Sequence, residues 1–484
     1  MGEFFITING FLESVLFFDI LFGSVEGNGI PFLVAWLIAG GIYITILTEF
    51  VNLRSFKHSF DIVRGKYKTK DDKGEISPFG ALTTALSATV GLGNIAGVAL
   101  AVSIGGPGAA FWMMMAGFLG MSLKFAEVTL SIQHRKFLKD GSVMGGAMEY
   151  LSKGLASKGM PIFGKVLAVS FAFLMIGGAI GGGNIFQVSQ AYGAISNEVS
   201  FFDSHPLVFG FTLAGLAGLV IIGGITRIAK ITERLVPVMV LIYITASLYI
   251  LGTNFSLIDD AFSIIFSEAF NTSAIYGGML GALVQGFQRA VFSSEAGIGS
   301  SPVAHATVKT KYPVRQGLVA LYEPFIDTIV VCTMTALVII ITGVYVPDGA
   351  YQEIIAAKEG AALTAAAYGT VISWFPTVLT LSIVLFAFST MISWSYYGER
   401  AWVYLFGEKY SIIYKLMFLS LSVIATVVSA KIMVDFSFML MLAMALPNIF
   451  GLIILSGDVR AQLKEYMAKL KSGELDAEVI SEYK

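Results

Sequence analysis

Two glycine pairs interrupt apolar stretches of this chain, and they are the residues best placed to bind a ligand. Residues 87–95 read SATVGLGNI and residues 293–301 read SSEAGIGSS, each with Gly-apolar-Gly at its centre. Where glycines break a helix, backbone N–H and C=O groups lose their partners. A half-helix that starts after Gly91 and Gly93 offers N–H groups to a carboxylate. One that ends before Gly297 offers carbonyls to an ammonium group or Na⁺, so a zwitterionic α-amino acid would satisfy both breaks.

The composition around these segments is typical of a membrane protein with several spans. Of 484 residues, 56% are hydrophobic and only 13% are charged, and the mean hydropathy is +0.78. Soluble domains carry about 25% charged residues. The formal net charge of −2 gives no indication of a nucleic-acid partner. The single cysteine, Cys332, lies in an apolar run, so we expect neither a disulfide nor a thiolate metal site.

Eleven apolar blocks are long enough, at about 20 residues each, to span a bilayer as helices. They lie near residues 30–53, 78–103, 107–131, 165–191, 207–224, 235–253, 273–301, 317–343, 373–398, 411–430 and 434–456. Ser77 and Pro78 predict the start of the second block, as an N-cap followed by proline in the first turn. A further apolar stretch, 4–22, contains Glu13 and Asp19, which favours an amphipathic helix on the membrane surface over another span.

The basic residues predict how the chain is oriented. The alternate loops and the C-terminal tail on one side contain 27 of the 31 lysines and arginines, whereas the opposite side contains only Lys358 and Lys431. The positive-inside rule makes the basic side cytoplasmic. We therefore expect a multi-pass protein of the plasma membrane with its N-terminus outside and its C-terminus in the cytoplasm.

If the first span is set aside, the glycine breaks lie in the first and sixth of ten helices, which predicts an inverted repeat of five plus five. The predicted divisions are an extracellular N-terminal segment, an extra transmembrane helix, the two repeats and a cytoplasmic tail: 1–29, 30–53, 78–253, 273–456 and 457–484. Broken backbone is tolerated in hydrocarbon only where it lines a cavity or is buried in protein. Paired breaks in matching segments therefore indicate a transporter site, although glycines that only let helices pack closely remain an alternative.

Three stretches resemble the alanine or glycine:cation symporter family. They are Ser77–Gly120, with VGLGN and GGPGAAFWMM, then QGFQRAVFSSEAGIGSSPVAHA at 285–306 and FAFSTMISWSYYGER at 386–400. The chain departs from the usual family signature at Ala110 and Met114, the latter in place of a second tryptophan. The resemblance implies an all-α leucine-transporter-type fold, Na⁺ as the cotransported ion, and alanine or glycine as substrate.

The resemblance also implies residue roles. Substrate contacts would come from the first break and the sixth core helix, namely Gly91, Leu92, Gly93, Asn94, Phe292, Ser293 and Gly297. Na⁺ ligands would be carbonyls of Ser87 and Val90 and hydroxyls of Ser389 and Thr390, unless those hydroxyls bond their own helix. The glycine-rich third core span adds two weaker candidates for polar contacts with the substrate, Asn184 and Gln187.

These observations favour a secondary active transporter that imports small neutral amino acids with Na⁺ by alternating access. Coupling to protons is the alternative, and a channel is less favoured because no continuous polar path is visible. We expect no enzyme, since HExxH, GxGD and a Ser–His pair within a span are all absent. We also expect the four histidines to be solvated, and Lys124 to pair with Glu127 three residues on. The oligomeric state stays open.

The charge asymmetry makes a testable prediction about topology. It places residues 54–76 in the cytoplasm and residues 344–372 outside. Lys66→Cys and Glu353→Cys should therefore react with a membrane-impermeant thiol reagent from opposite sides of sealed vesicles. Labelling of both positions from one side would contradict the eleven-span topology.

Overall fold

The chain folds almost entirely into helices. This computed structural model describes residues 10, 14, 18–20, 29–67, 69, 72–138, 141–271, 278–346, 349–427 and 439–483. Residues 4–22, where the sequence predicts an amphipathic helix, therefore lie largely outside the described residues. Within them, the strands β1 (Lys136–Phe137) and β2 (Val143–Met144) form one small antiparallel pair in a loop.

The helices fall into two groups by chain order, those up to Thr253 and those after it. The first half contains α2 (Phe32–Leu47), α3 (Val51–Arg54), α4 (Phe56–Val63), α5 (Pro78–Thr89), η1 (Gly93–Gly97), α6 (Val98–Gly105), α7 (Gly108–His134), α8 (Ala147–Glu149), η2 (Tyr150–Gly154), α9 (Leu155–Ser157), α10 (Pro161–Ile180), η3 (Gly181–Ile185), α11 (Phe186–Glu198), α12 (Ser200–Ser204), α13 (Pro206–Ile221) and α14 (Gly224–Thr253). The second half contains η4 (Phe255–Leu257), α15 (Ile258–Ala269), α16 (Gly278–Ser294), α17 (Pro302–His305), α18 (Pro313–Ala320), α19 (Tyr322–Pro324), η5 (Phe325–Cys332), α20 (Thr333–Thr342), α21 (Gln352–Ala356), α22 (Gly360–Gly369), α23 (Phe375–Phe406), η6 (Glu408–Tyr410), α24 (Ser411–Ile424), α26 (Ala445–Lys471) and α27 (Glu474–Tyr483).

Within the described residues, six continuous helical stretches are long and apolar enough to cross a membrane. They are Gly108–His134, Pro161–Glu198, Gly224–Thr253, Pro313–Thr342, Phe375–Phe406 and Met439–Lys471. The pair α5 and α6, bent by 48°, makes a seventh if it is one span, and α2 and α13 are shorter apolar helices. The predicted blocks 273–301 and 411–430 correspond to α16 and α24, and part of each lies outside the described residues. The count of eleven spans therefore stays a prediction.

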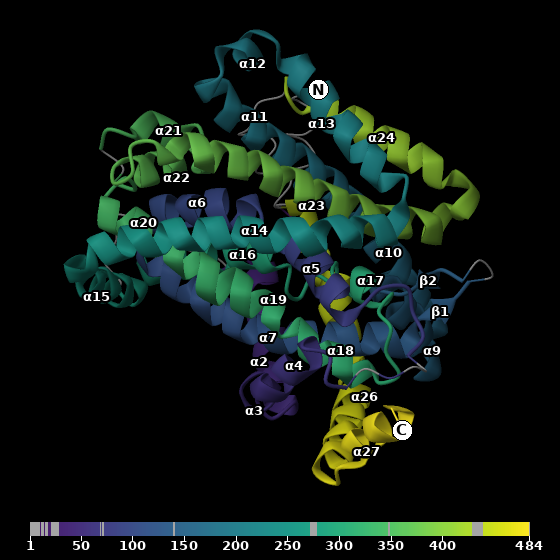
Figure 1. Cartoon of the computed structure of the whole chain (residues 1–484). Coiled ribbons are helices and arrows are strands. Elements are labelled where there is room, and N and C mark those ends of the chain that lie inside the picture. The colour runs from purple at the N-terminus through teal and green to yellow at the C-terminus, as the bar shows by residue number, and fades with distance from the viewer. Residues whose placement is uncertain are drawn as a thin grey trace.

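The two broken segments lie at the centre of the bundle. Helix α16 packs against α6, η1 and α7, and the long helix α23 packs against α5, α10 and α11. Figure 1 shows α6 and α16 between α23 and α7. The apolar side chains from Val98 to Val102 on α6 are fully buried, as expected for a helix surrounded by others. This arrangement encloses both breaks in protein and keeps them away from lipid.

Local signals predict where some helices begin, but not where all of them end. The Ser77 hydroxyl accepts a hydrogen bond from the Gly80 N–H at 2.9 Å, and Pro78 occupies the first turn of α5, as predicted. By contrast, α2 ends at Leu47, within the predicted span 30–53, and the chain turns at Glu49 and Phe50, both at positive φ. At the other end of the chain, α26 continues to Lys471, across the division predicted at 457.

Candidate binding site at the helix breaks

The first break has the position that its glycines predict. Helix α5 ends at Thr89, and helical structure resumes at Gly93 as the π-helix η1. The Gly91 N–H donates to Asn94 Oδ1 at 2.9 Å, and the Asn94 N–H donates to the Gly91 carbonyl at 3.3 Å. The side chain of Asn94 thus satisfies one N–H that the broken helix would otherwise leave unpaired.

The two broken segments touch at Gly93. A Cβ added to Gly93 would lie 2.9 Å from Cα of Ser293 on α16, closer than a side-chain carbon normally approaches backbone. Only glycine allows this contact between the backbones. The sequence predicts both residues to be substrate contacts, and the fold brings them together.

A buried carboxylate that the site prediction omits joins these segments. Asn94 Nδ2 donates to Asp327 Oδ1 at 2.6 Å and to its backbone carbonyl at 3.0 Å. The hydroxyls of Ser293 and Thr328 each donate to Asp327 Oδ2 at 2.8 Å. Asp327 lies in the π-helix η5 and is fully buried. Its signal in the sequence is an acidic residue within a membrane span, which is costly unless it has a function.

The residues predicted to bind Na⁺ meet on the other side of the first break. Thr390 Oγ1 on α23 donates to the Ser87 carbonyl at 2.9 Å, and Ser87 Oγ donates to the Ser389 carbonyl at 2.8 Å. A Cβ on Gly91 would lie 2.5 Å from Thr390 Oγ1. The Ser389 hydroxyl donates to the Phe386 carbonyl of its own helix at 3.0 Å. Val90, in an extended conformation, ends α5 beside them.

The remaining predicted contacts divide into two groups. Gln187 lies beside the first break, because a Cβ on Gly91 would be 3.7 Å from its Oε1. Phe292 packs edge-on against Phe186, with ring centroids 5.1 Å apart. By contrast, Asn184 Nδ2 donates at 2.6 Å to the Phe418 carbonyl on α24. Gly297 also lies away from the first break, in the segment between α16 and α17.

The second break is stabilised by side chains of other helices. Glu295, Gly297 and Gly299 all have positive φ between the end of α16 and the start of α17. The Gly299 N–H donates to Glu127 Oε1 on α7 at 3.1 Å. Asn448 on α26 donates both to the Gly297 carbonyl at 2.8 Å and to Glu127 Oε1 at 2.6 Å. Side chains from α7 and α26 therefore replace the missing helical hydrogen bonds.

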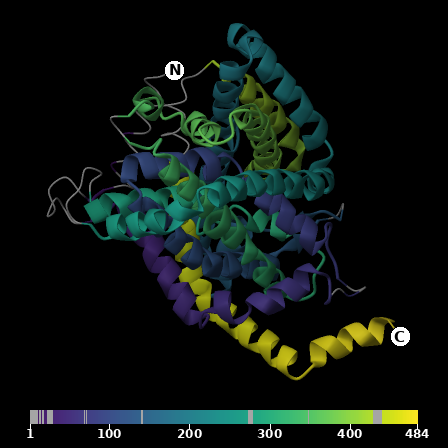
Figure 2. The same ribbon diagram turned by 60° about the vertical axis from the view of Figure 1, so that its left-hand side comes forward.

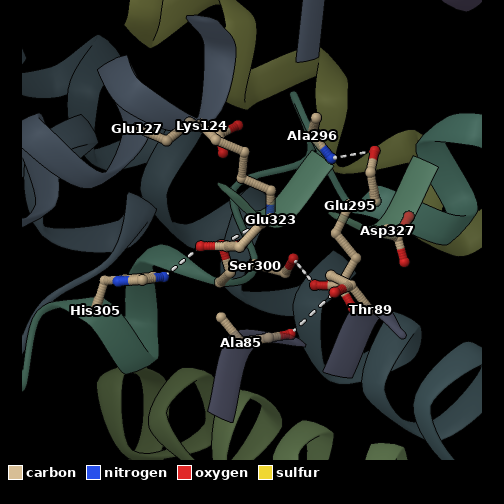
Figure 3. Close-up of polar contacts among 12 residues, drawn as sticks. Ala85, Thr89, Lys124, Glu127, Glu295, Ala296, Ser300, His305, Glu323 and Asp327 are labelled. Carbon is tan, nitrogen blue, oxygen red and sulfur yellow. Dashed lines mark hydrogen bonds and ion pairs between the residues drawn. The ribbon is translucent and has the colours of Figure 1, made fainter. Parts of the chain in front are cut away.

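A buried charge network adjoins this second break. Lys124 Nζ donates to Ser301 Oγ at 2.7 Å and lies 3.1 Å from Glu323 Oε2. His305 contacts Glu323 through one ring nitrogen and Gln316, at 2.7 Å, through the other. Figure 3 shows His305 and Lys124 pointing at Glu323 from different segments.

Two expectations about these charges are wrong. Lys124 pairs with Glu323 and not with Glu127, because α7 directs its side chain into the bundle toward α19. His305 is fully buried and not solvated. His58, in the loop helix α4, is half-buried against Tyr466, and this burial lowers its pKa from 6.5 to about 4. Of the four histidines, only His205 is exposed.

Comparison with known proteins identifies the family of the chain. Residues 18–480 match the model of the sodium:alanine symporter family. The chain belongs to this family. It is similar to the sodium/alanine symporter AgcS of Methanococcus maripaludis, with 40% identity over 90% of this chain and 94% of the relative. A probable sodium/glutamine symporter, GlnT of Bacillus subtilis, is 33% identical over 91% of this chain and 89% of its own.

The likeness also extends to a solved structure. The transporter MhsT, crystallised in complex with L-phenylalanine, superposes with a TM-score of 0.53 at 16% identity, covering 81% of this chain and 93% of that one. At this identity the match concerns the fold alone, which is the leucine-transporter fold. The family and its relatives are transporters, so this member of the sodium:alanine symporter family is a multi-pass membrane transporter and not an enzyme.

The charge network at the second break makes a prediction about stability. Glu323→Gln leaves Lys124 in the bundle without its counter-charge, and breaking a buried pair costs about 3 kcal/mol or more. We expect a loss of that order in the free energy of unfolding, measured by denaturant titration in detergent micelles. Glu478→Gln is the matched control, because it removes the partner of an exposed lysine, Lys311, which should cost about 1 kcal/mol at most. Equal losses for both variants would contradict a stabilising role for the buried pair.

Proposed function

We propose that this protein is a sodium-coupled symporter that carries small neutral amino acids, alanine and glycine among them, into the cell by alternating access. The observation that carries the proposal is the meeting of the first break with α16, where the Gly93 backbone lies against Ser293 beside the Asp327 carboxylate. So close an approach leaves room for a short side chain only. The named relative AgcS, a sodium/alanine symporter, supports the same substrate class.

We assign the substrate to the group around the first break. Backbone N–H groups of Leu92 and Gly93 would receive the carboxylate at the start of η1, and Asn94 and Ser293 would contact its polar atoms. Gly91, Gln187 and Phe292 would complete the walls. Asn184 and Gly297 bond to other helices, and we propose no direct contact for them.

We assign Na⁺ to the contact between the first break and α23. Na⁺ is a hard cation that needs several oxygens in place of its hydration shell. The Ser87 carbonyl and the Thr390 hydroxyl meet there, with Ser389 adjacent. The Val90 carbonyl, at the end of α5, would add a further oxygen. Asp327, with its oxygens beside Asn94, supplies a negative charge that suits a second cation or the substrate ammonium.

We propose that the protein has the helix arrangement that its sequence predicts. Ten helices form an inverted repeat of residues 78–253 and 273–456, and the helix at 30–53 lies outside that core. The N-terminus is outside the plasma membrane, and the tail from 457 is in the cytoplasm.

Coupling to protons is the second candidate, because a buried carboxylate such as Asp327 is a proton acceptor as well as a cation ligand. Purified protein in sealed phosphatidylcholine vesicles separates the candidates. We expect labelled alanine to accumulate when Na⁺ is imposed outside, and not under a proton gradient without Na⁺. Accumulation under the proton gradient alone would favour the second candidate, and equilibration without accumulation would indicate a channel.

The Na⁺ assignment predicts unequal effects of two adjacent hydroxyls. Thr390→Ala removes the hydroxyl that reaches Ser87, so the Na⁺ concentration for half-maximal uptake should rise roughly tenfold, the equivalent of about 1.4 kcal/mol. Ser389→Ala should raise it less, because that hydroxyl already donates to its own helix. Saturating Na⁺ should restore alanine affinity in both variants. Wild-type Na⁺ dependence in both would rule out this site.

The substrate assignment predicts that Gly93 tolerates no side chain. Gly93→Ala forces apart the backbones of η1 and α16, and overpacking of this kind costs about 1–3 kcal/mol. Alanine affinity, measured by equilibrium binding in detergent, should fall by about tenfold or more. Gly97→Ala is the matched control on the same π-helix, since a Cβ there meets no atom within 4 Å. Equal affinities in the two variants would place the substrate elsewhere.

A further inference from the structure

A groove that contains no residue of either break lies where α2 ends beside α26. Its volume is about 730 Å³, and it is lined by the end of α2 with the turn after it and by the part of α26 beyond Gly457. The two helices lie side by side, and Figure 2 shows α26 continuing past the end of α2 toward the C-terminus. Nothing in the proposed transport cycle uses this groove.

The charge of the groove is strongly positive. Arg54, Arg460, Lys464 and Lys471 line it, together with one acidic residue, Glu49. Glu49 Oε2 lies 2.5 Å from Arg54, and its Oε1 lies 3.8 Å from Arg460. Among the ion pairs of the described residues, none involves Lys464 or Lys471, so most of the positive charge is not neutralised by protein.

Helical spacing directs this charge into the groove. Arg460, Lys464 and Lys471 are four and seven residues apart on α26, which puts them on one face of the helix. That face is turned toward the end of α2 and toward α3, where Arg54 is the fourth basic residue of the groove. The groove is therefore suited to an anion with several oxygens, such as a phosphate group.

The apolar surroundings of the groove indicate that the anion belongs to a lipid. Leu47 and Met467 line the groove itself. Next to the groove, Ile46 near the end of α2 and Leu53 on α3 expose 61% and 64% of their surface. On α26, the apolar sequence gives way to charged residues at Asp458. A boundary between apolar and basic surface is the depth at which phospholipid headgroups lie.

We propose that this groove binds an anionic phospholipid, with its phosphate among Arg460, Lys464 and Arg54 and its acyl chains along Ile46 and Leu53. A free phosphate ion would use the basic residues but gain nothing from the exposed apolar side chains. Bound there, the lipid bridges α2, which lies outside the proposed ten-helix core, and the part of α26 that extends beyond this core. The site goes beyond the proposed function and does not depend on it.

Lipid retention tests this proposal. Purified full-length protein in detergent is mixed with phosphatidylglycerol or with phosphatidylcholine, and bound lipid is counted by native mass spectrometry. We expect phosphatidylglycerol to bind with clear preference, and the variant Arg460→Gln, Lys464→Gln to bind it about tenfold more weakly. The control is Lys165→Gln, Lys230→Gln, which removes two exposed basic residues elsewhere and should bind like the wild type. Lys471→Gln is a milder second variant, whose binding should also fall.

Three results would overturn the proposal. One is equal retention of the two lipids by the wild-type protein. Another is unchanged binding of phosphatidylglycerol when Arg460 and Lys464, or Lys471, are replaced in protein that remains folded by size-exclusion chromatography. The third is displacement of the lipid by an equal concentration of inorganic phosphate, which would assign the groove to a free anion.

Discussion

A helix that is broken inside a bilayer must find partners for its free backbone groups, and this requirement organises the centre of the molecule. No water is available in hydrocarbon to bond an orphaned N–H or C=O, and each unsatisfied group costs several kcal/mol. At the first break the partner is the Asn94 side chain. At the second break the partners come from α7 and α26, as Glu127 and Asn448. Helices α7 and α26 thus contact the second break through hydrogen bonds as well as through packing.

Charged side chains also lie in the core beside the second break, and their charge must be balanced. A buried ion is stable only if other groups pair with it and satisfy its remaining hydrogen bonds. Lys124 does so through Glu323 and Ser301, and Glu323 is also contacted by His305. The network joins α7, α17 and α19 around the second break. If the proposed transport cycle moves this break, Lys124, Glu323 and His305 must rearrange together, because each contacts another of them.

Glycines let the segments around the first break pack closely. Gly93 lets η1 approach α16, and Gly360 on α22 lies so near Ala96 that an added Cβ would come within 2.2 Å of its carbonyl oxygen. Thr364 on the same helix donates to the Ile95 carbonyl at 3.0 Å. Helix α22, in the segment that the sequence predicts to be an outer loop, thus packs against η1. Small residues on η1, α16 and α22 thus leave little space around the proposed site, as the proposed short amino acid requires.

The sequence by itself determined the class of the protein, the position of both breaks and most of the residues around the first one. These features depend on local properties, namely apolar length, loop charge and the two glycine pairs, and on motifs with a family resemblance. The structure has the N-cap at Ser77 where the sequence predicts it. It also brings together Ser87 and Thr390, which the resemblance assigns to one site. Only the tertiary structure revealed that Asp327 joins Asn94 to Ser293, that Lys124 pairs with Glu323, and that His305 is buried. Each of these contacts links residues far apart in the chain. Spacing along the sequence identifies neighbours on one helix, but it cannot state which face of another helix a charged side chain will meet once both are packed.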